Sequence, residues 1–174
     1  MSGAMASTQD QIDLRRLVDL YGFTIDTQQW SLFDQIFTED VLAEFPGFTW
    51  NDLASFKQDF ATFHIIFDVT RHSMSNFICS VDHGRATSVT YGHWFVQRTG
   101  TEGGDSLTSF GWYDDDYVRT AAGWRIARRR SRVSWWSGNL AVMAPSGLEF
   151  VMDVHSLRTS AQEGTVPLLN LLMI

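Results

Sequence analysis

The amino-acid sequence predicts an α+β domain in which N-terminal helices pack on one face of a curved, mainly antiparallel sheet. In the first third of the chain, apolar residues recur at helical spacing. From Thr70 onward, runs rich in β-branched and aromatic residues are instead separated by turn signals. The connections between these runs are short, which favours an antiparallel meander.

Two helices are expected near the N-terminus. Ser7 or Thr8 can cap the first, because each offers a side-chain oxygen to the free amides of a first turn. Leucine, valine and isoleucine then recur every three or four residues as far as Asp26, where we expect the helix to end. A second, short helix fits residues 30–37.

A short strand, a third helix and four long strands complete the predicted elements. The short strand covers residues 41–45 and ends at Pro46-Gly47. Asn51 can cap a helix over residues 52–63, which carries phenylalanines on its apolar side. The meander is expected to consist of strands over residues 70–81, 85–98, 107–119 and 123–133.

Composition and charge limit the possible functions. The 174 residues, 44% of them hydrophobic, suit a single domain over 1–174 with a core at about 8–133 and a C-terminal extension over 134–174. The 13 phenylalanines and 7 tryptophans can fill this core or line a pocket for a flat apolar ligand. A formal net charge of −7 repels phosphate backbones, which argues against a nucleic-acid partner.

The ends of the chain and its cysteine content favour a cytoplasmic protein. Cys79 is the single cysteine, so no intrachain disulfide can form. Residues 1–7 lack the basic region and the apolar run of a signal peptide. The apolar run over 166–174 is too short to span a membrane, so we expect it to dock on the protein itself or on a neighbouring subunit.

The segment after Val133 suggests a homo-oligomer. Trp135 and Trp136 would be exposed together if this segment were a loop, and a solvated pair of indoles is unfavourable. We therefore expect a subunit interface or a pocket lid here. The sequence does not determine the number of subunits.

Asp26 and His72 are the main candidates for a chemical role. A carboxylate that holds one imidazole nitrogen leaves the other free to take a proton near neutral pH. If the fold brings the two side chains together in an apolar pocket, the chain can perform acid/base chemistry. The alternatives are a core histidine with a buried partner and an aspartate that caps the end of the helix.

Other polar residues are candidates on the strength of their position. Tyr21 and Tyr113 can donate hydrogen bonds to a substrate, or they can be ordinary core tyrosines. Asn76 lies four residues after His72, so strand alternation places both on one face together with Met74 and Ile78. Such a mixture suits a mainly apolar pocket with a few polar groups.

Other chemistries find no support in the sequence. No metal-ligand spacing, phosphate-binding glycine loop or nucleophile elbow is present, and no cofactor is expected. The acidic triplet Asp114 to Asp116 fits a solvated strand segment, and His64 has no partner that can be identified. On the last strand, alternation places Arg125, Ala127 and Arg129 on one face, opposite Trp124, Ile126 and Arg128.

An ordered set of residues carries a resemblance to a known family. The set consists of Tyr21, Asp26 and Trp30, then Thr70-Arg71-His72 with Asn76, then Gly84-Arg85-Ala86, Gly111-Trp112-Tyr113 with Tyr117, and Gly123-Trp124-Arg125-Ile126. Over about residues 8–133 the chain resembles the nuclear transport factor 2-like superfamily. Within it, the chain is similar to SnoaL-like enzymes of the scytalone dehydratase, bile-acid dehydratase and hexachlorocyclohexane dehydrochlorinase type.

The resemblance implies a cone-shaped α+β barrel and a cofactor-independent lyase of dehydratase type, or a related isomerase or cyclase. The substrate would be a small, largely apolar cyclic molecule that bears a hydroxyl or a carbonyl. The resemblance also implies a dimer or a trimer of this chain. The implied catalytic residues are His72, Asp26, Tyr21 and Arg129, and the implied substrate-binding residues are Tyr113, Asn76, Met74 and Trp30.

Two departures keep the reaction open within this class. The lysine of the dehydrochlorinase has no counterpart here, and the second pocket histidine of scytalone dehydratase falls on Val96. His93 lies nearby but is expected to face away. A non-catalytic ligand-binding or assembly module, such as the small subunit of a ring-hydroxylating dioxygenase, is the alternative, since the same fold serves both purposes.

Overall fold

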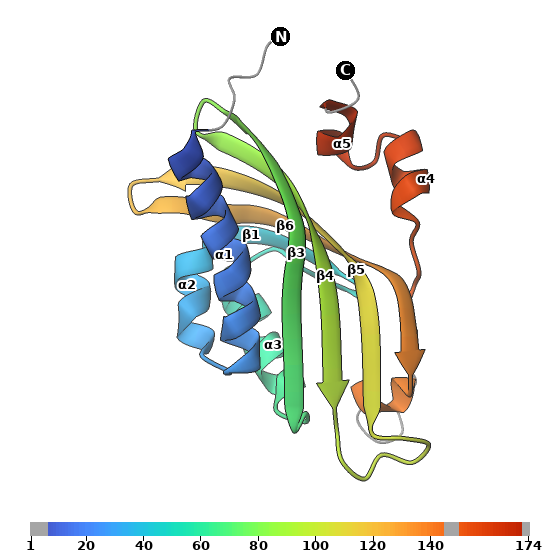
Figure 1. The fold of residues 1–174 in the computed structure, drawn as a ribbon. Helices are drawn as coiled ribbons and strands as arrows, with labels where there is room; N and C mark the ends of the chain where they lie inside the picture. Colours follow the sequence, from blue (N-terminus) through green and yellow to red (C-terminus); the bar gives the residue numbers. More distant parts are fainter. Residues whose placement is uncertain (1–6, 145–149, 172–174) are drawn as a thin grey trace.

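The computed structural model describes residues 7–144 and 150–171 and shows helices packed on one face of a six-stranded sheet (Figure 1). The predicted α+β class is confirmed, although the sheet stays open and does not close into a barrel. Residues 1–6, in the segment expected to lack a signal peptide, lie outside the described residues. The same holds for residues 172–174 of the apolar C-terminal run.

The helices begin and end close to the expected residues. Helix α1 covers Thr8–Asp26, and the Ser7 hydroxyl accepts a hydrogen bond from the Asp10 amide, as expected of a cap. The second helix is a 3₁₀ turn, η1, over Trp30–Leu32 followed by α2 over Phe33–Ile36. Helix α3 covers Leu53–His64, and its cap is Asp52, whose carboxylate binds the Ser55 amide, so the prediction of Asn51 is wrong by one residue.

The sheet has the strand order β2-β1-β6-β5-β4-β3. The four long strands form the predicted antiparallel meander, and β1 adds to β6 in parallel. Strand β2 pairs with β1 beyond the turn at Pro46-Gly47 and had no signal in the sequence analysis. The strands are β1 Phe37–Phe45, β2 Phe48–Trp50, β3 Val69–Asp82, β4 Arg85–Gln97, β5 Ser106–Thr120 and β6 Gly123–Gly138.

Irregularities in β3 and β6 reverse the faces predicted for several side chains. In β3 the register slips between Ser75 and Ile78, and Asn76 has a positive φ of 47°. Asn76 and Ile78 are therefore exposed, while Phe77 takes the inner face. A bulge adds one residue to one strand and so shifts the alternation by one position.

A second bulge changes the faces predicted for side chains on the last strand, β6. Asp116 faces Arg128 and Tyr117 faces Ile126, so Ala127 is the extra residue. The buried side of β6 consequently carries Trp124, Ile126 and Arg129 together. Regular alternation had placed Arg129 on the opposite face from the other two. Strand β6 also runs through Trp135 and Trp136, so this pair belongs to a strand and not to a loop.

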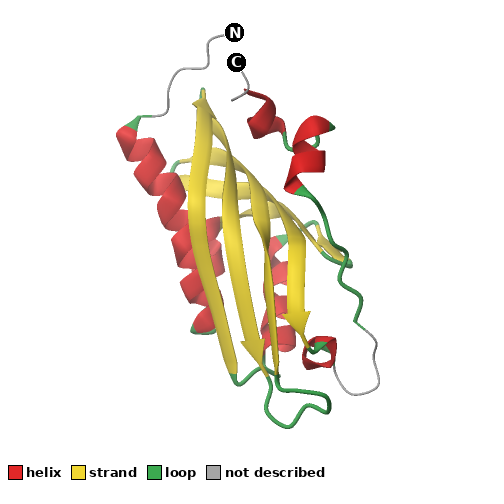
Figure 2. Ribbon diagram, turned by 45° about the vertical axis from the view of Figure 1, so that its right-hand side comes forward, coloured by secondary structure: helices red, strands yellow, loops and turns green. Residues whose placement is uncertain are grey.

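The outer face of the sheet is partly covered by the C-terminal segment. Short helices α4 (Leu157–Gln162) and α5 (Pro167–Leu171) lie on the side of the sheet away from α1 (Figures 1 and 2). Val166 and Leu168 pack there on Val89 and Trp112. Further along this face, large aromatic side chains remain exposed: Tyr91, Phe110 and Trp135. These aromatic side chains are compatible with the expected homo-oligomer, which stays a prediction.

A buried ion pair crosses β5 and β6 inside the core. The Asp115 carboxylate accepts hydrogen bonds from Nε and Nη2 of Arg129 at 2.8 and 2.7 Å, and both side chains are fully buried. Asp114 is also buried. The expectation that the acidic triplet is solvated is therefore wrong for two of its three residues, because an arginine run lies directly opposite on β6.

We expect Asp115→Asn to destabilise the fold by about 3–5 kcal/mol, because it leaves the Arg129 charge buried without its counter-ion. Chemical denaturation measures this loss. The matched control is Asp116→Asn, since the Asp116 side chain is 40% exposed and also pairs with an arginine. Equal losses in the two variants would contradict this account of the buried pair.

Candidate active site

Asp26 and His72 are brought together where the end of α1 meets β3. The Oδ1 atom of Asp26 lies 2.7 Å from Nδ1 of His72, and Oδ2 accepts the His72 backbone amide at 2.8 Å. Thr70 adds a third hydrogen bond, from its hydroxyl to Oδ1 at 3.0 Å. Since a carboxylate accepts and does not donate, Nδ1 carries the proton and Nε2 of His72 is left with a lone pair.

The electrostatics favour an ionised Asp26. Burial acts to raise the pKa of the half-buried carboxyl group, but the hydrogen bonds from the His72 ring and amide and from Thr70 outweigh it, and the pKa is lowered. A permanent negative charge therefore stands behind the imidazole. It fixes the tautomer of His72 and can stabilise a protonated ring.

A glycine on α1 permits this contact. Gly22 lies one helical turn before Asp26, on the same side of the helix. A Cβ atom at Gly22 would lie 3.3 Å from the carbonyl oxygen of His72 and 3.4 Å from its Cβ. The helix can thus approach β3 closely enough for a side chain as short as aspartate to reach the imidazole.

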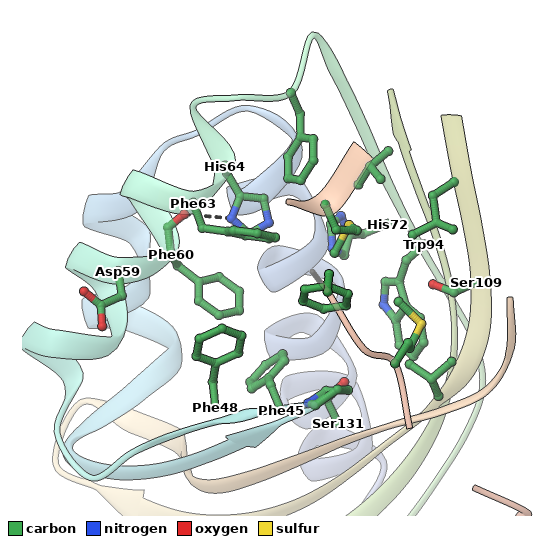
Figure 3. A pocket seen from close by; sticks show the side chains of 18 of the residues that line it. Phe45, Phe48, Asp59, Phe60, Phe63, His64, His72, Trp94, Ser109 and Ser131 are labelled. Carbon is green, nitrogen blue, oxygen red and sulfur yellow. Dashed lines mark hydrogen bonds between the residues drawn. The ribbon is translucent and has the colours of Figure 1, made fainter. Parts of the chain in front are cut away.

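His72 lines a cavity of about 420 Å³ between α3 and the inner face of the sheet (Figure 3). This is within the usual size range of small-molecule sites. Polar groups on the wall are few and include Ser109 on β5 and Ser131 on β6. Most of the lining is aromatic or aliphatic, with side chains such as Phe45, Phe60, Phe63, Phe67, Val96 and Leu107.

Two tyrosines form the floor of this cavity, and a buried arginine supports them. Tyr21 and Tyr113 both line it, and their ring centroids lie 5.5 Å apart. The Arg129 guanidinium lies 4.1 Å from the centroid of Tyr21 and 4.2 Å from that of Tyr113. Arg129 itself does not line the cavity, so it contacts these rings from beneath and positions them.

Burial keeps both phenols protonated. It raises the pKa of Tyr21 to about 12, against the opposing positive charge of Arg129, and it raises that of Tyr113 well above its ordinary value. Burial also opposes the charge on Arg129, but the Asp115 carboxylate outweighs it and raises the pKa of the guanidinium. The tyrosine hydroxyls can therefore act as neutral hydrogen-bond donors at the cavity floor.

A second histidine lines the cavity, and the sequence analysis missed it. His64, the last residue of α3, is buried, and its Nδ1 lies 2.7 Å from the Phe60 carbonyl oxygen. Its ring centroid lies 6.5 Å from that of His72. The spacing of four residues on a helix was the available signal, because it allows a side chain to bond the carbonyl one turn earlier.

Three residues expected to bind substrate lie outside the cavity lining. Asn76 is exposed at the β3 bulge, and half-buried Met74 packs against the core near Gly22. Trp30 packs behind the site, with its ring 5.5 Å from His64. His93 faces away as expected, stacked on Phe110 on the outer face of the sheet.

None of the helices within residues 7–144 and 150–171 has the length and apolar character needed to cross a bilayer. Within the same ranges, no group of three or more histidine, cysteine, aspartate or glutamate side chains is arranged to hold a metal ion.

Comparison with known proteins gives one family match and several uncharacterised relatives. The model of the SnoaL-like domain family matches residues 6–130. Uncharacterised proteins from Mycobacterium tuberculosis and Mycobacterium bovis are 30% identical over 129 residues, which cover 72% of this chain and 86% of theirs.

Solved structures share the fold at low sequence identity. A Kribbella flavida protein has a TM-score of 0.73 at 20% identity and covers 78% of this chain and 98% of its own. A Novosphingobium aromaticivorans protein, provisionally assigned as a scytalone dehydratase, has a TM-score of 0.67 at 18% identity, with coverages of 73% and 85%. A hexachlorocyclohexane dehydrochlorinase has a TM-score of 0.67 at 15% identity, with coverages of 80% and 96%.

We expect Gly22→Ala to separate Asp26 from His72, because the new methyl group crowds the His72 backbone. Glycine to alanine in a helix interior ordinarily stabilises by about 1 kcal/mol, whereas here we expect a loss of stability. Thermal unfolding and the NMR resonance of the His72 Nδ1 proton measure the two effects. The expectation would be contradicted if Gly22→Ala gained the full stability usual for this change in a helix and left the His72 Nδ1 proton resonance unshifted.

We expect His64 to make the fold less stable in acid. Burial lowers the pKa of His64 to about 4 from its ordinary value of 6.5. Between these two pH values the unfolded chain binds a proton that the folded chain does not, so stability falls as the pH drops through this window, by up to about 3 kcal/mol.

The variant His64→Phe should lose this part of the pH dependence, which denaturation at pH values from 7 to about 4 measures. The matched control is His93→Phe, which replaces a histidine on the outer face. If His64→Phe and the wild type lost stability in parallel as the pH falls, the assignment of this effect to His64 would be wrong.

Proposed function

The chain belongs to the SnoaL-like domain family, and within it we propose that it is a cofactor-independent lyase of dehydratase type. The proposed substrate is a small, largely apolar cyclic molecule that bears a carbonyl and a hydroxyl. The observation that carries the proposal is the Asp26–His72 pair, joined at 2.7 Å with the imidazole on the wall of an apolar cavity.

The proposed reaction begins with proton transfer to His72. Its Nε2 takes a proton from a carbon next to the substrate carbonyl, and the electrons of the broken C–H bond form an enolate. Asp26 stabilises the positive charge that the imidazole gains in this step. General-base catalysis of this kind contributes about 10²–10⁴-fold to a rate.

The second step expels the hydroxyl group on the neighbouring carbon. The enolate electrons form the new C=C bond as the C–O bond breaks, and the imidazolium of His72 returns its proton to the departing oxygen. The products are the unsaturated carbonyl compound and one water molecule, and His72 is again neutral. An isomerase or a cyclase would share the first step and return the proton elsewhere.

The tyrosines on the cavity floor are proposed to stabilise the enolate. Their hydroxyls stay protonated and interact with each other, so the pair can donate a phenol proton to an oxygen on which negative charge develops. Arg129 is proposed as a positioning residue, since its guanidinium lies against the rings of both Tyr21 and Tyr113 and is neutralised by Asp115.

The alternative function is a non-catalytic ligand-binding or assembly module. It would be favoured by separation of Asp26 from His72 beyond hydrogen-bond length, or by a cavity filled with phenylalanine side chains. Neither condition is met, because the two side chains are in contact and about 420 Å³ of space remains beside His72.

A screen of cyclic hydroxy-ketones tests the proposal, with loss of water followed by mass spectrometry. For a compound that is turned over, we expect His72→Ala to lower kcat by at least about 10²-fold. Asp26→Asn should also lower kcat, because the neutral amide cannot stabilise the imidazolium. His93→Ala is the matched control and should keep wild-type turnover. Unchanged turnover by His72→Ala would exclude the mechanism.

A further inference from the structure

We infer that the substrate carries a second hydroxyl, one that stays on the product, and that Nε2 of His64 binds it. This inference rests on the proposed function, since it takes the reacting part of the molecule to lie at His72. It makes His64 a specificity-determining residue. The substrate class narrows to flat cyclic ketones with a hydroxyl donor besides the leaving group.

A backbone carbonyl fixes the tautomer of His64. Its Nδ1 lies 2.7 Å from the carbonyl oxygen of Phe60, which can only accept a hydrogen bond. The proton of the neutral ring is therefore on Nδ1, and Nε2 carries a lone pair. Figure 3 shows this second nitrogen on the side of the ring that faces the cavity and His72.

The environment of His64 keeps its ring neutral. Its surroundings are aromatic, with Phe60, Phe63, Phe67 and Trp30 all in ring contact. Burial disfavours its protonated form, and the nearby Asp26 charge does not compensate. Nε2 thus remains an acceptor over the pH range in which the folded protein would turn over substrate.

Nε2 of His64 is an acceptor that needs a hydrogen-bond donor from the ligand. Among residues 7–144 and 150–171, no side chain or amide hydrogen-bonds Nε2 of His64. The hydroxyls of Ser109, Ser131 and the two tyrosines can rotate to donate or accept, so they accept many ligands. His64 cannot adapt in this way. A ligand that places an apolar group against Nε2 leaves a buried polar atom unpaired, which is unfavourable.

The hydroxyl bound by His64 is a different group from the hydroxyl that leaves. A hydrogen bond donated to His64 raises the electron density on the donating oxygen, which makes it harder to expel. The leaving hydroxyl instead departs as water, so its oxygen must receive a proton, and that proton comes from His72. The two ring centroids lie 6.5 Å apart on one cavity, so a single small molecule can contact both histidines.

A binding experiment tests the inference without turnover. The probes are the positional isomers of hydroxy-tetralone and the methoxy ether of each, which removes the donor and keeps the bicyclic ketone. Dissociation constants are measured by quenching of tryptophan fluorescence for the wild type, His64→Phe and His93→Phe. His93→Phe is the matched control, because His93 lies on the outer face of the sheet.

We expect at least one hydroxy isomer to bind the wild type and His93→Phe about five-fold more tightly than its ether, as one net hydrogen bond allows. In His64→Phe this preference should vanish, while the ether binds at least as well as before. Circular dichroism of His64→Phe establishes that the variant is folded. An unchanged preference in folded His64→Phe, or no preference for any isomer in the wild type, would overturn the inference.

The same probes distinguish this inference from the proposed function. His72→Ala should keep the preference for the hydroxy isomer, because His64 is untouched in that variant. If the preference depends on His64 but no hydroxy-ketone is ever dehydrated, the binding role stands and the lyase proposal fails. If dehydration depends on His72 but the preference is insensitive to His64, the lyase proposal stands and the role of His64 fails.

Discussion

The carboxylate of Asp26 is the constraint on which the site depends. Its two oxygens accept three hydrogen bonds, all from the first residues of β3, and so tie the last turn of α1 to the start of the sheet. The bond to the His72 amide fixes the backbone, and the bond to Nδ1 fixes the ring on that backbone. The same carboxylate thus both docks the helix on the sheet and orients the imidazole. The absence of a side chain at Gly22 allows the helix to come this close to His72.

The sequence predicted this contact but not all of its surroundings, because bulges interrupt the strand alternation on which the predicted faces depend. Periodicity located each long strand within a few residues, because every strand has a buried face. A single extra residue at Asn76 and another at Ala127 then exchanged the faces that follow. Neither position has a glycine or proline to signal a bulge. Asn76 was therefore expected in the pocket, and Trp124 was expected to face away from Arg129.

The buried charges show a second limit of reading one strand at a time. In the sequence, Asp114 to Asp116 fit a solvated strand segment, and alternation alone places Arg128 and Arg129 on opposite faces of the last strand. Pairing β5 with β6 sets Asp114 to Asp116 opposite Arg128 to Arg130 in register. The central pair, Asp115 and Arg129, is buried as a neutral unit beneath Tyr21 and Tyr113. The sequence shows the acidic run and the arginine run separately, and only the pairing of β5 with β6 reveals that they form the ion pair beneath the cavity floor.

The two pocket histidines differ in what holds Nδ1, and this difference supports the separate roles proposed for them. In both, Nδ1 donates to an oxygen and Nε2 is free. For His72 the oxygen belongs to an ionised carboxylate, which stabilises the ring when it gains a proton. For His64 it belongs to a backbone carbonyl among phenylalanines, which offers no such charge and leaves protonation unfavourable. The same side chain, held in the same way, is thus suited to move a proton at one wall of the cavity. At the other wall it can only accept a hydrogen bond.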